Sequence, residues 1–244
     1  NGNVQVSTSI GKSVADAVDL WMTEPFHQVA MLDPLLALSG YGEWREEIGR
    51  FHFGATLDVL RGRTADAART RFPVRYPEEG TVLPLWSYDG GETPDPLTSC
   101  YGYTAPTGPP LVLILGAGDV VPRVNGVTFT DASGTVLPSC WFDQTTYRNG
   151  SSAAQATGRG VLAMRSAVVV MPRNPLAFGA RVTEQAAEEI QILEHRQGGI
   201  QVPAQTLRHI RDARQQRVAP ARGDLAQAQH RVQERDRKSL YTAD

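Results

Sequence analysis

The sequence predicts an α+β protein made of three consecutive parts. Apolar residues with helical spacing, followed by an alternating strand, occupy residues 1–70. Short strand candidates between Gly- and Pro-rich turns fill residues 71–182 and are typical of an antiparallel β-sandwich. Residues 183–244 are rich in glutamine and arginine and hold a single aromatic residue, so we expect a polar helical or disordered tail there.

A helical hairpin is expected near the start of the chain. Apolar residues recur at i, i+3, i+4 and i+7 from Val14 to Trp21, and Ser13 is a suitable N-cap for a helix over residues 13–23. Pro25 suits the first position of a second, shorter helix, which Asp33-Pro34 ends.

Strands follow this hairpin. Apolar residues alternate with others from Phe51 to Val59, which is the pattern of a half-buried strand, and residues 36–44 are its expected antiparallel partner. The next part of the chain offers five more short strands at regular spacing, which predicts a β-sandwich of Ig-like character. These strand candidates are Val82–Ser87, Leu111–Leu115, Val127–Asp131, Thr135–Phe142 and Val161–Met171.

Composition and charge limit the classes of partner. The chain has 244 residues, of which 41% are hydrophobic and 20% charged, as in ordinary globular proteins. A formal net charge of −2 provides no concentrated positive field, so we expect no nucleic-acid partner. No stretch approaches the ~18 consecutive apolar residues of a membrane-spanning helix, so we also expect no membrane span.

Both cysteines, Cys100 and Cys140, lie in the strand-rich part of the chain. A single even pair favours a disulfide formed in an oxidising compartment, and closing this loop stabilises the fold by about 4 kcal/mol on the chain-entropy model. Two buried free thiols are the alternative, because free cysteine is often buried. We expect an extracellular or cell-surface location.

The Gly116-Ala117-Gly118 segment follows an apolar run and superficially resembles a dinucleotide-binding turn. That interpretation requires a helix to follow, and Pro122 interrupts any such helix. We therefore expect a β-turn and no nucleotide cofactor.

Three acidic residues, Asp89, Glu92 and Asp95, lie in a loop rich in glycine and proline. Carboxylates of this kind could hold Ca²⁺, but their spacing matches no established calcium loop. A solvated turn is the favoured interpretation.

The segment AVDLWMTEPFHQVAMLDPLLALSGYG, residues 17–42, resembles the second half of bacterial CAP superfamily domains, which are relatives of the cysteine-rich secretory and pathogenesis-related proteins. The residues that carry the resemblance are Trp21, Pro25, His27, Leu32 and Gly40-Tyr41-Gly42. The resemblance implies a partial three-layer α/β/α module over residues 1–70, with residues 71–182 as the β-rich extension that follows such domains in some secreted bacterial proteins.

Domains of this family form a cavity lined by two histidines and two acidic residues. By the resemblance, His27 matches the second histidine and Glu24 the second acid, so this chain holds at most half of the set. Zinc is the possible cofactor, with His27 and Glu24 as metal ligands, but a zinc site requires three or four protein ligands. The alternative is structural, with Glu24 near a helix start and His27 at the surface.

The resemblance implies a secreted, non-enzymatic protein that binds extracellular lipid, glycan or cell-wall material. A metal-assisted hydrolase that uses His27 and Glu24 is the second hypothesis. A structural or adhesive module is the third. The sequence contains neither a Gly-x-Ser-x-Gly elbow nor a His-Glu-x-x-His motif, which favours binding over catalysis.

Overall fold

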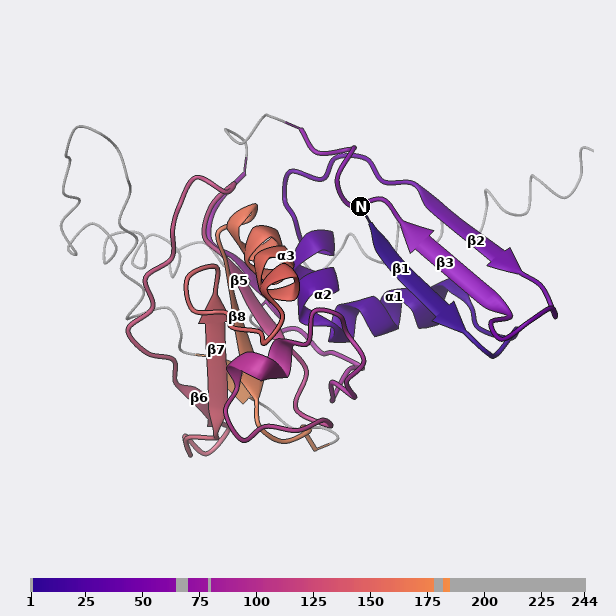
Figure 1. Ribbon diagram of the computed structural model, residues 1–244. Coiled ribbons are helices and arrows are strands. Elements are labelled where there is room, and N and C mark those ends of the chain that lie inside the picture. The colour runs from indigo at the N-terminus through magenta and orange to yellow at the C-terminus, as the bar shows by residue number, and fades with distance from the viewer. Residues whose placement is uncertain (1, 65–69, 79, 178–181, 185–244) are drawn as a thin grey trace, which may run out of the picture. The chain divides into compact units, whose positions relative to one another are not determined.

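The computed structural model describes residues 2–64, 70–78, 80–177 and 182–184 (Figure 1). Within these ranges the protein is α+β, and all paired strands are antiparallel. The described residues belong to one compact unit. None of their helices is long and apolar enough to cross a membrane. The predicted tail, apart from its first two residues, lies outside the described residues.

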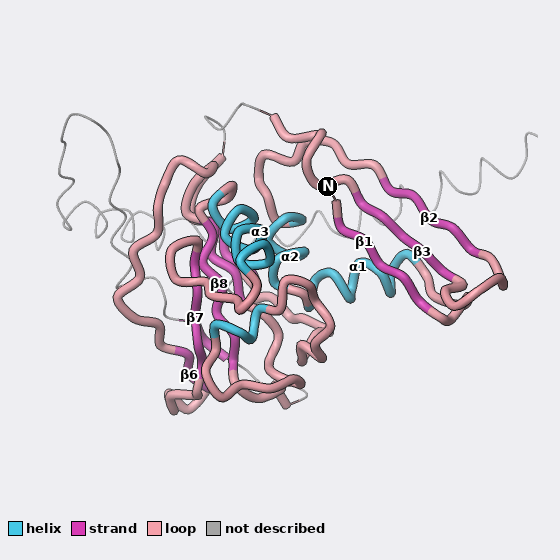
Figure 2. Tube along the Cα trace, viewed as in Figure 1, coloured by secondary structure: helices cyan, strands magenta, loops and turns pink. Residues whose placement is uncertain are grey.

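A three-stranded sheet forms in the first part of the chain, with the strand order β1-β3-β2 (Figure 2). Its strands are β1 (Asn3–Ser7), β2 (Tyr41–Arg45) and β3 (Phe53–Leu57). The predicted antiparallel pairing of the second and third strands is confirmed. Helix α1 (Val14–Thr23) packs on one face, where Ala17 and Trp21 meet Phe53 and Ala55 in a buried cluster.

The two predicted helices are confirmed, with their start signals. The Ser13 hydroxyl accepts a hydrogen bond from the Asp16 amide at 3.2 Å, and an Asp16 carboxylate oxygen accepts one from the Ser13 amide at 2.7 Å. These reciprocal bonds form a capping box at the start of α1. Helix α2 (Pro25–Met31) begins directly after it, with Pro25 in its first turn.

A four-stranded sheet follows, with the order β4-β5-β8-β7. The strands are β4 (Val74–Tyr76), β5 (Leu111–Ile114), β7 (Ser139–Asp143) and β8 (Ala167–Pro172). One face packs against α2 and α3 (Ser152–Ala163) in the main buried cluster of the protein. Phe26 of α2 meets the Tyr147 ring edge-on, with the centroids 5.0 Å apart.

Helix α3 corrects the expectation for this region. The sequence predicted one strand over Val161–Met171, but the chain is helical through Ala163, and strand β8 begins at Ala167. Helices therefore cover this face of the sheet, where the Ig-like expectation placed strands. Gly158 permits the close approach of α3 to Tyr147, because a Cβ at this position would lie only 2.5 Å from the tyrosine ring.

The opposite face of the four-stranded sheet is also covered. Strands β6 (Phe129–Asp131) and β9 (Val182–Glu184) pair antiparallel, and Phe129 packs on Leu111 and Val170. The Gly116-Ala117-Gly118 segment bends away from β5 without a helix after it, as expected. Gly118 has a φ of +95°, a conformation that favours glycine.

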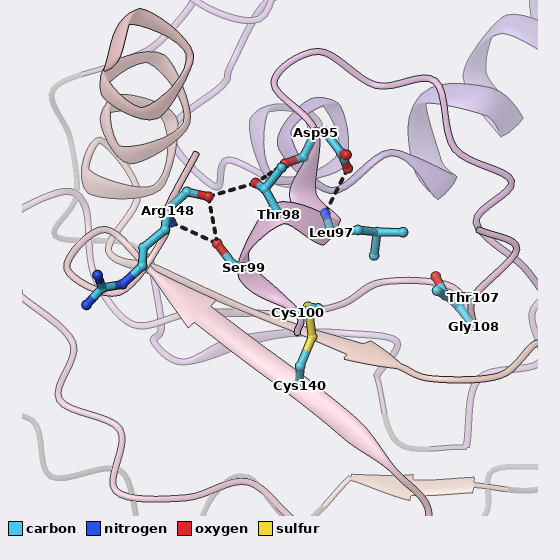
Figure 3. The surroundings of a disulfide bond; sticks show 9 residues. All are labelled: Asp95, Leu97, Thr98, Ser99, Cys100, Thr107, Gly108, Cys140 and Arg148. Atoms are coloured by element: carbon cyan, nitrogen blue, oxygen red, sulfur yellow. Dashed lines mark hydrogen bonds between the residues drawn. A yellow bond between two sulfur atoms is a disulfide. The ribbon is translucent and has the colours of Figure 1, made fainter. Parts of the chain in front are cut away.

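The predicted disulfide joins Cys100 to Cys140, with their Cα atoms 5.6 Å apart (Figure 3). Cys100 follows the short 3₁₀ helix η2 (Pro96–Ser99), and Cys140 lies on β7. A hydrogen bond close to the disulfide also joins the two segments, since the Ser99 hydroxyl accepts from the Arg148 amide at 2.8 Å. The pair is typical of proteins that mature in an oxidising compartment.

A buried ion-pair network connects three segments of the chain. The Asp33 carboxylate lies 2.6 Å from the Nε atom of Arg63 and 3.0 Å from that of Arg165. Arg165 also donates a hydrogen bond to the Val59 carbonyl at 3.2 Å. The side chains of Asp33 and Arg165 are 1% and 2% exposed. Loss of this ionic contact would therefore cost free energy, because the remaining charge would stay buried.

Candidate functional site

The candidate site lies at the start of helix α2. Glu24 is the residue before the helix, and Pro25 occupies its first turn, so the chain enters the helix without a side-chain cap from Glu24. The exposed amide groups of the first turn need other acceptors. A Glu92 oxygen, Oε1, fills this role by accepting hydrogen bonds from the amides of Phe26 and His27 at 2.8 and 2.9 Å.

The same Glu92 oxygen reaches the imidazole of His27. It lies 2.8 Å from Nδ1, and a carboxylate oxygen of Glu24 lies 3.3 Å from that nitrogen. We refer to Glu24, His27 and Glu92 as the His27 cluster. One ring nitrogen thus faces two carboxylates, which favours a proton on Nδ1.

The cluster is largely shielded from water. The Glu92 side chain is completely buried, and those of Glu24 and His27 are 9% and 20% exposed. The second carboxylate oxygen of Glu92, Oε2, is buried without a hydrogen-bond partner among the described residues. Burying ionisable groups in this way costs free energy unless their charges are balanced within the cluster.

Burial and mutual charge set the protonation of the cluster. Burial raises the pKa of Glu24 to about 7, an effect that His27 opposes and Glu92 reinforces. Burial disfavours the imidazolium of His27, but the hydrogen bond and charge of Glu92 outweigh it, so the pKa of His27 is raised. The pKa of Glu92 is also raised by burial, against the influence of His27. The three groups therefore titrate as a coupled set, and burial holds the pKa of Glu24 at about 7.

A glycine turn brings Glu92 to the helix. Tyr88 and Thr107 exchange two backbone hydrogen bonds of 3.0 Å, which fix the base of the loop. Gly90 and Gly91 then adopt φ angles of +88° and +102°, a conformation that other residues rarely accept. Tyr88 itself is buried beside the acidic residues, and burial followed by the charge of Glu92 raises the pKa of its hydroxyl.

Glu24 and His27, the two residues singled out by the resemblance, do lie together. Glu92 was expected in a solvated turn with Asp89 and Asp95, and this expectation is wrong for Glu92. Asp89 accepts a hydrogen bond from the Ser87 hydroxyl, and Asp95 accepts one from the amide of Leu97 at the start of η2. Only the glycine pair before Glu92 hinted at a special position, because it permits a turn toward another part of the chain.

The cluster does not fit a zinc centre. Among the described residues, no group of three or more His, Cys, Asp and Glu side chains is arranged to hold a metal ion. The 2.8 Å separation between His27 Nδ1 and Glu92 is that of a direct hydrogen bond. The same oxygen already accepts two amide hydrogens. The chemistry available to the cluster is hydrogen bonding and proton exchange.

No protein-family model, curated protein or solved structure matches the chain.

Proposed function

We propose that the chain is a secreted, non-enzymatic binding protein of CAP-like type that recognises extracellular lipid, glycan or cell-wall material through the His27 cluster. The observation that carries this proposal is the burial of one imidazole and two carboxylates at the start of α2. Groups whose pKa values are perturbed by burial and by a specific partner are frequent at functional sites.

The local fold supports the CAP-like part of the proposal. The tryptophan of α1 packs on a small sheet, the proline turn leads into α2, and His27 faces inward beside Glu24. Trp21, Pro25 and His27 are among the residues that carry the resemblance. The β-rich extension adds Glu92, a third ionisable group at the same place.

Binding is favoured over hydrolysis by what surrounds His27. No serine, threonine or cysteine side chain of the described residues hydrogen-bonds to its imidazole, so the described part of the chain places no hydroxyl or thiol nucleophile there for His27 to activate. The metal-assisted alternative lacks a suitable ligand set in the described part of the chain. The partly exposed imidazole of His27 remains as a hydrogen-bonding group, and Glu92 raises its pKa, which suits reversible recognition of a polar group.

The test is a binding panel with three extracellular classes of probe. Phosphatidylglycerol vesicles, chitobiose and purified peptidoglycan are offered to the full chain and to His27→Gln. We expect one class to bind and the variant to bind it about tenfold less tightly, since a hydrogen bond to a charged group is worth about 1.5–3 kcal/mol. Glu43→Gln, on the exposed strand β2, serves as the matched control.

Two results would contradict the proposal. One is the absence of binding to all three probes by the folded wild-type protein. The other is equal binding by wild type, His27→Gln and the control. Circular dichroism establishes that each variant is folded before binding is compared.

A further inference from the structure

A second site lies on the four-stranded sheet, on the face opposite the helices. An open hollow of about 330 Å³ forms between the outward side of β7 and the segment 121–124. This volume lies at the lower end of the range for ligand pockets, roughly 300–1,000 Å³, and suits a ligand of one or two sugar rings. Its lining is mixed and includes Arg123, Val124, Trp141, Asp143, Thr145 and Thr146. None of these belongs to the His27 cluster.

Trp141 provides a fixed apolar surface. It lines the hollow and packs against the cluster of Leu111, Phe129 and Val170, so the core supports the indole. No described residue hydrogen-bonds to the indole N–H, and this group is not fully buried. An aromatic ring that is supported by the core and has a free polar edge is suited to an amphipathic ligand.

Asp143 provides a fixed acceptor. The residue is 1% exposed, and its Oδ1 atom accepts hydrogen bonds from the amides of Thr145 and Thr146 at 2.7 and 3.0 Å. Both threonine hydroxyls also donate to Oδ1, at 2.7 and 3.1 Å. Among the described residues, all hydrogen bonds donated to this carboxylate go to Oδ1, and Asp143 is one of the residues that line the hollow. The carboxylate is therefore held in place before any ligand arrives.

Arg123 provides donors at the rim. Its side chain is exposed, and among the described residues it has neither an ion pair nor a hydrogen bond. A free guanidinium presents five N–H groups. The hollow thus combines an aromatic face, a buried acceptor and a cationic donor.

We infer that this hollow binds a saccharide, with a pyranose ring stacked on Trp141 and its hydroxyl groups bonded to Asp143 and Arg123. Sugars have an apolar C–H face and hydroxyls that both donate and accept, which is the combination that this lining complements. A lipid chain would offer no hydrogen bond to the Asp143 carboxylate or to the Arg123 guanidinium, so it would make no use of either group. A simple anion would meet the Asp143 charge.

The test uses titration calorimetry and saturation-transfer NMR on the full chain with cellobiose, chitobiose and maltose. We expect at least one disaccharide to bind, and Trp141→Leu and Arg123→Gln each to weaken it by about tenfold or more, as for aromatic and arginine anchors in other sites. Trp86→Leu and Arg148→Gln, whose side chains lie outside the hollow, are the matched controls and should bind as wild type.

The outcomes separate this site from the His27 cluster. Loss of disaccharide binding in Trp141→Leu and Arg123→Gln but not in His27→Gln supports the inference, whatever the fate of the proposed function. Failure of all three disaccharides to bind at about 10 mM would overturn it. So would equal binding by the two variants and their controls. Arg123→Gln keeps the test decisive if the tryptophan variant is unstable, because Arg123 is exposed.

Discussion

Replacing Glu24 with glutamine tests whether the His27 cluster is as coupled as its geometry indicates. Glutamine keeps the shape of the side chain and removes its ionisation. Glu24 is a buried acid whose carboxylate lies 3.3 Å from His27, and burial raises its pKa from 4.5 to about 7. The variant should therefore change how stability depends on pH more than it changes the fold.

The sign and size of the effect follow from proton linkage. A raised folded-state pKa means that the folded protein holds a proton that the unfolded chain has released. The contribution to stability is complete below pH 4.5 and is lost as the pH rises through about 7. Each pKa unit corresponds to about 1.4 kcal/mol, so between about pH 5 and pH 8 Glu24 should account for a fall of about 2–3 kcal/mol in the free energy of unfolding.

Urea unfolding at several pH values between these limits measures the effect. Wild type should lose stability toward high pH, and Glu24→Gln should show a fall smaller by about 2–3 kcal/mol. Glu43→Gln is the control, because an exposed carboxylate whose pKa is lowered stays ionised throughout this range. Parallel curves for wild type and Glu24→Gln would refute the burial and coupling of Glu24.

Three further sets of substitutions test the packing. Asp33→Asn should reduce the free energy of unfolding by about 3–5 kcal/mol, because the buried guanidinium beside it loses its counter-charge; a cost below about 1 kcal/mol in urea unfolding would contradict that pairing. Replacing Cys100 and Cys140 together with serine should cost about 4 kcal/mol for their separation of 40 residues, and unchanged stability would contradict the constraint. Gly158→Ala should lose about 1–3 kcal/mol by overpacking against a buried tyrosine, whereas Gly160→Ala, which meets nothing within 4 Å, should gain up to about 1 kcal/mol. Similar thermal unfolding of the two glycine variants would contradict the close contact.

The first helices were predictable because their signals are local. Ser13 and Pro25 mark helix starts by side-chain and ring geometry alone, and the structure uses both. Strand β1 was missed because its pattern is inverted, with Val4 59% and Val6 54% exposed while the polar residues Asn3 and Gln5 are buried. Alternation indicates a strand only when the apolar residues face the core.

Helix α3 was missed for a different reason. Residues 152–163 are mostly small and include two glycines, Gly158 and Gly160, so their helical propensity and apolar stripe are weak. Packing against the sheet and the Ser151 cap compensate for this weakness. Tertiary contacts of this kind cannot be predicted from a short stretch of sequence.

The candidate site was half predictable. Glu24 and His27 are close in sequence, so the resemblance and helical spacing brought them together. Glu92 lies 65 residues from His27, and the glycine pair before it indicates a turn but not that its carboxylate points inward. The glycine turn and the bridge at Tyr88 place it, and both depend on pairing with distant residues.

The most direct test of the central claim, that Glu92 and His27 form one ionisable unit, is an NMR titration of the His27 imidazole in wild type and in Glu92→Gln. Glutamine can still accept the two amide hydrogen bonds, so the helix start is retained. The account predicts a His27 pKa above the ordinary value in wild type and a clearly lower pKa in the variant, because burial then acts without the opposing carboxylate. The same His27 pKa in both proteins would contradict it.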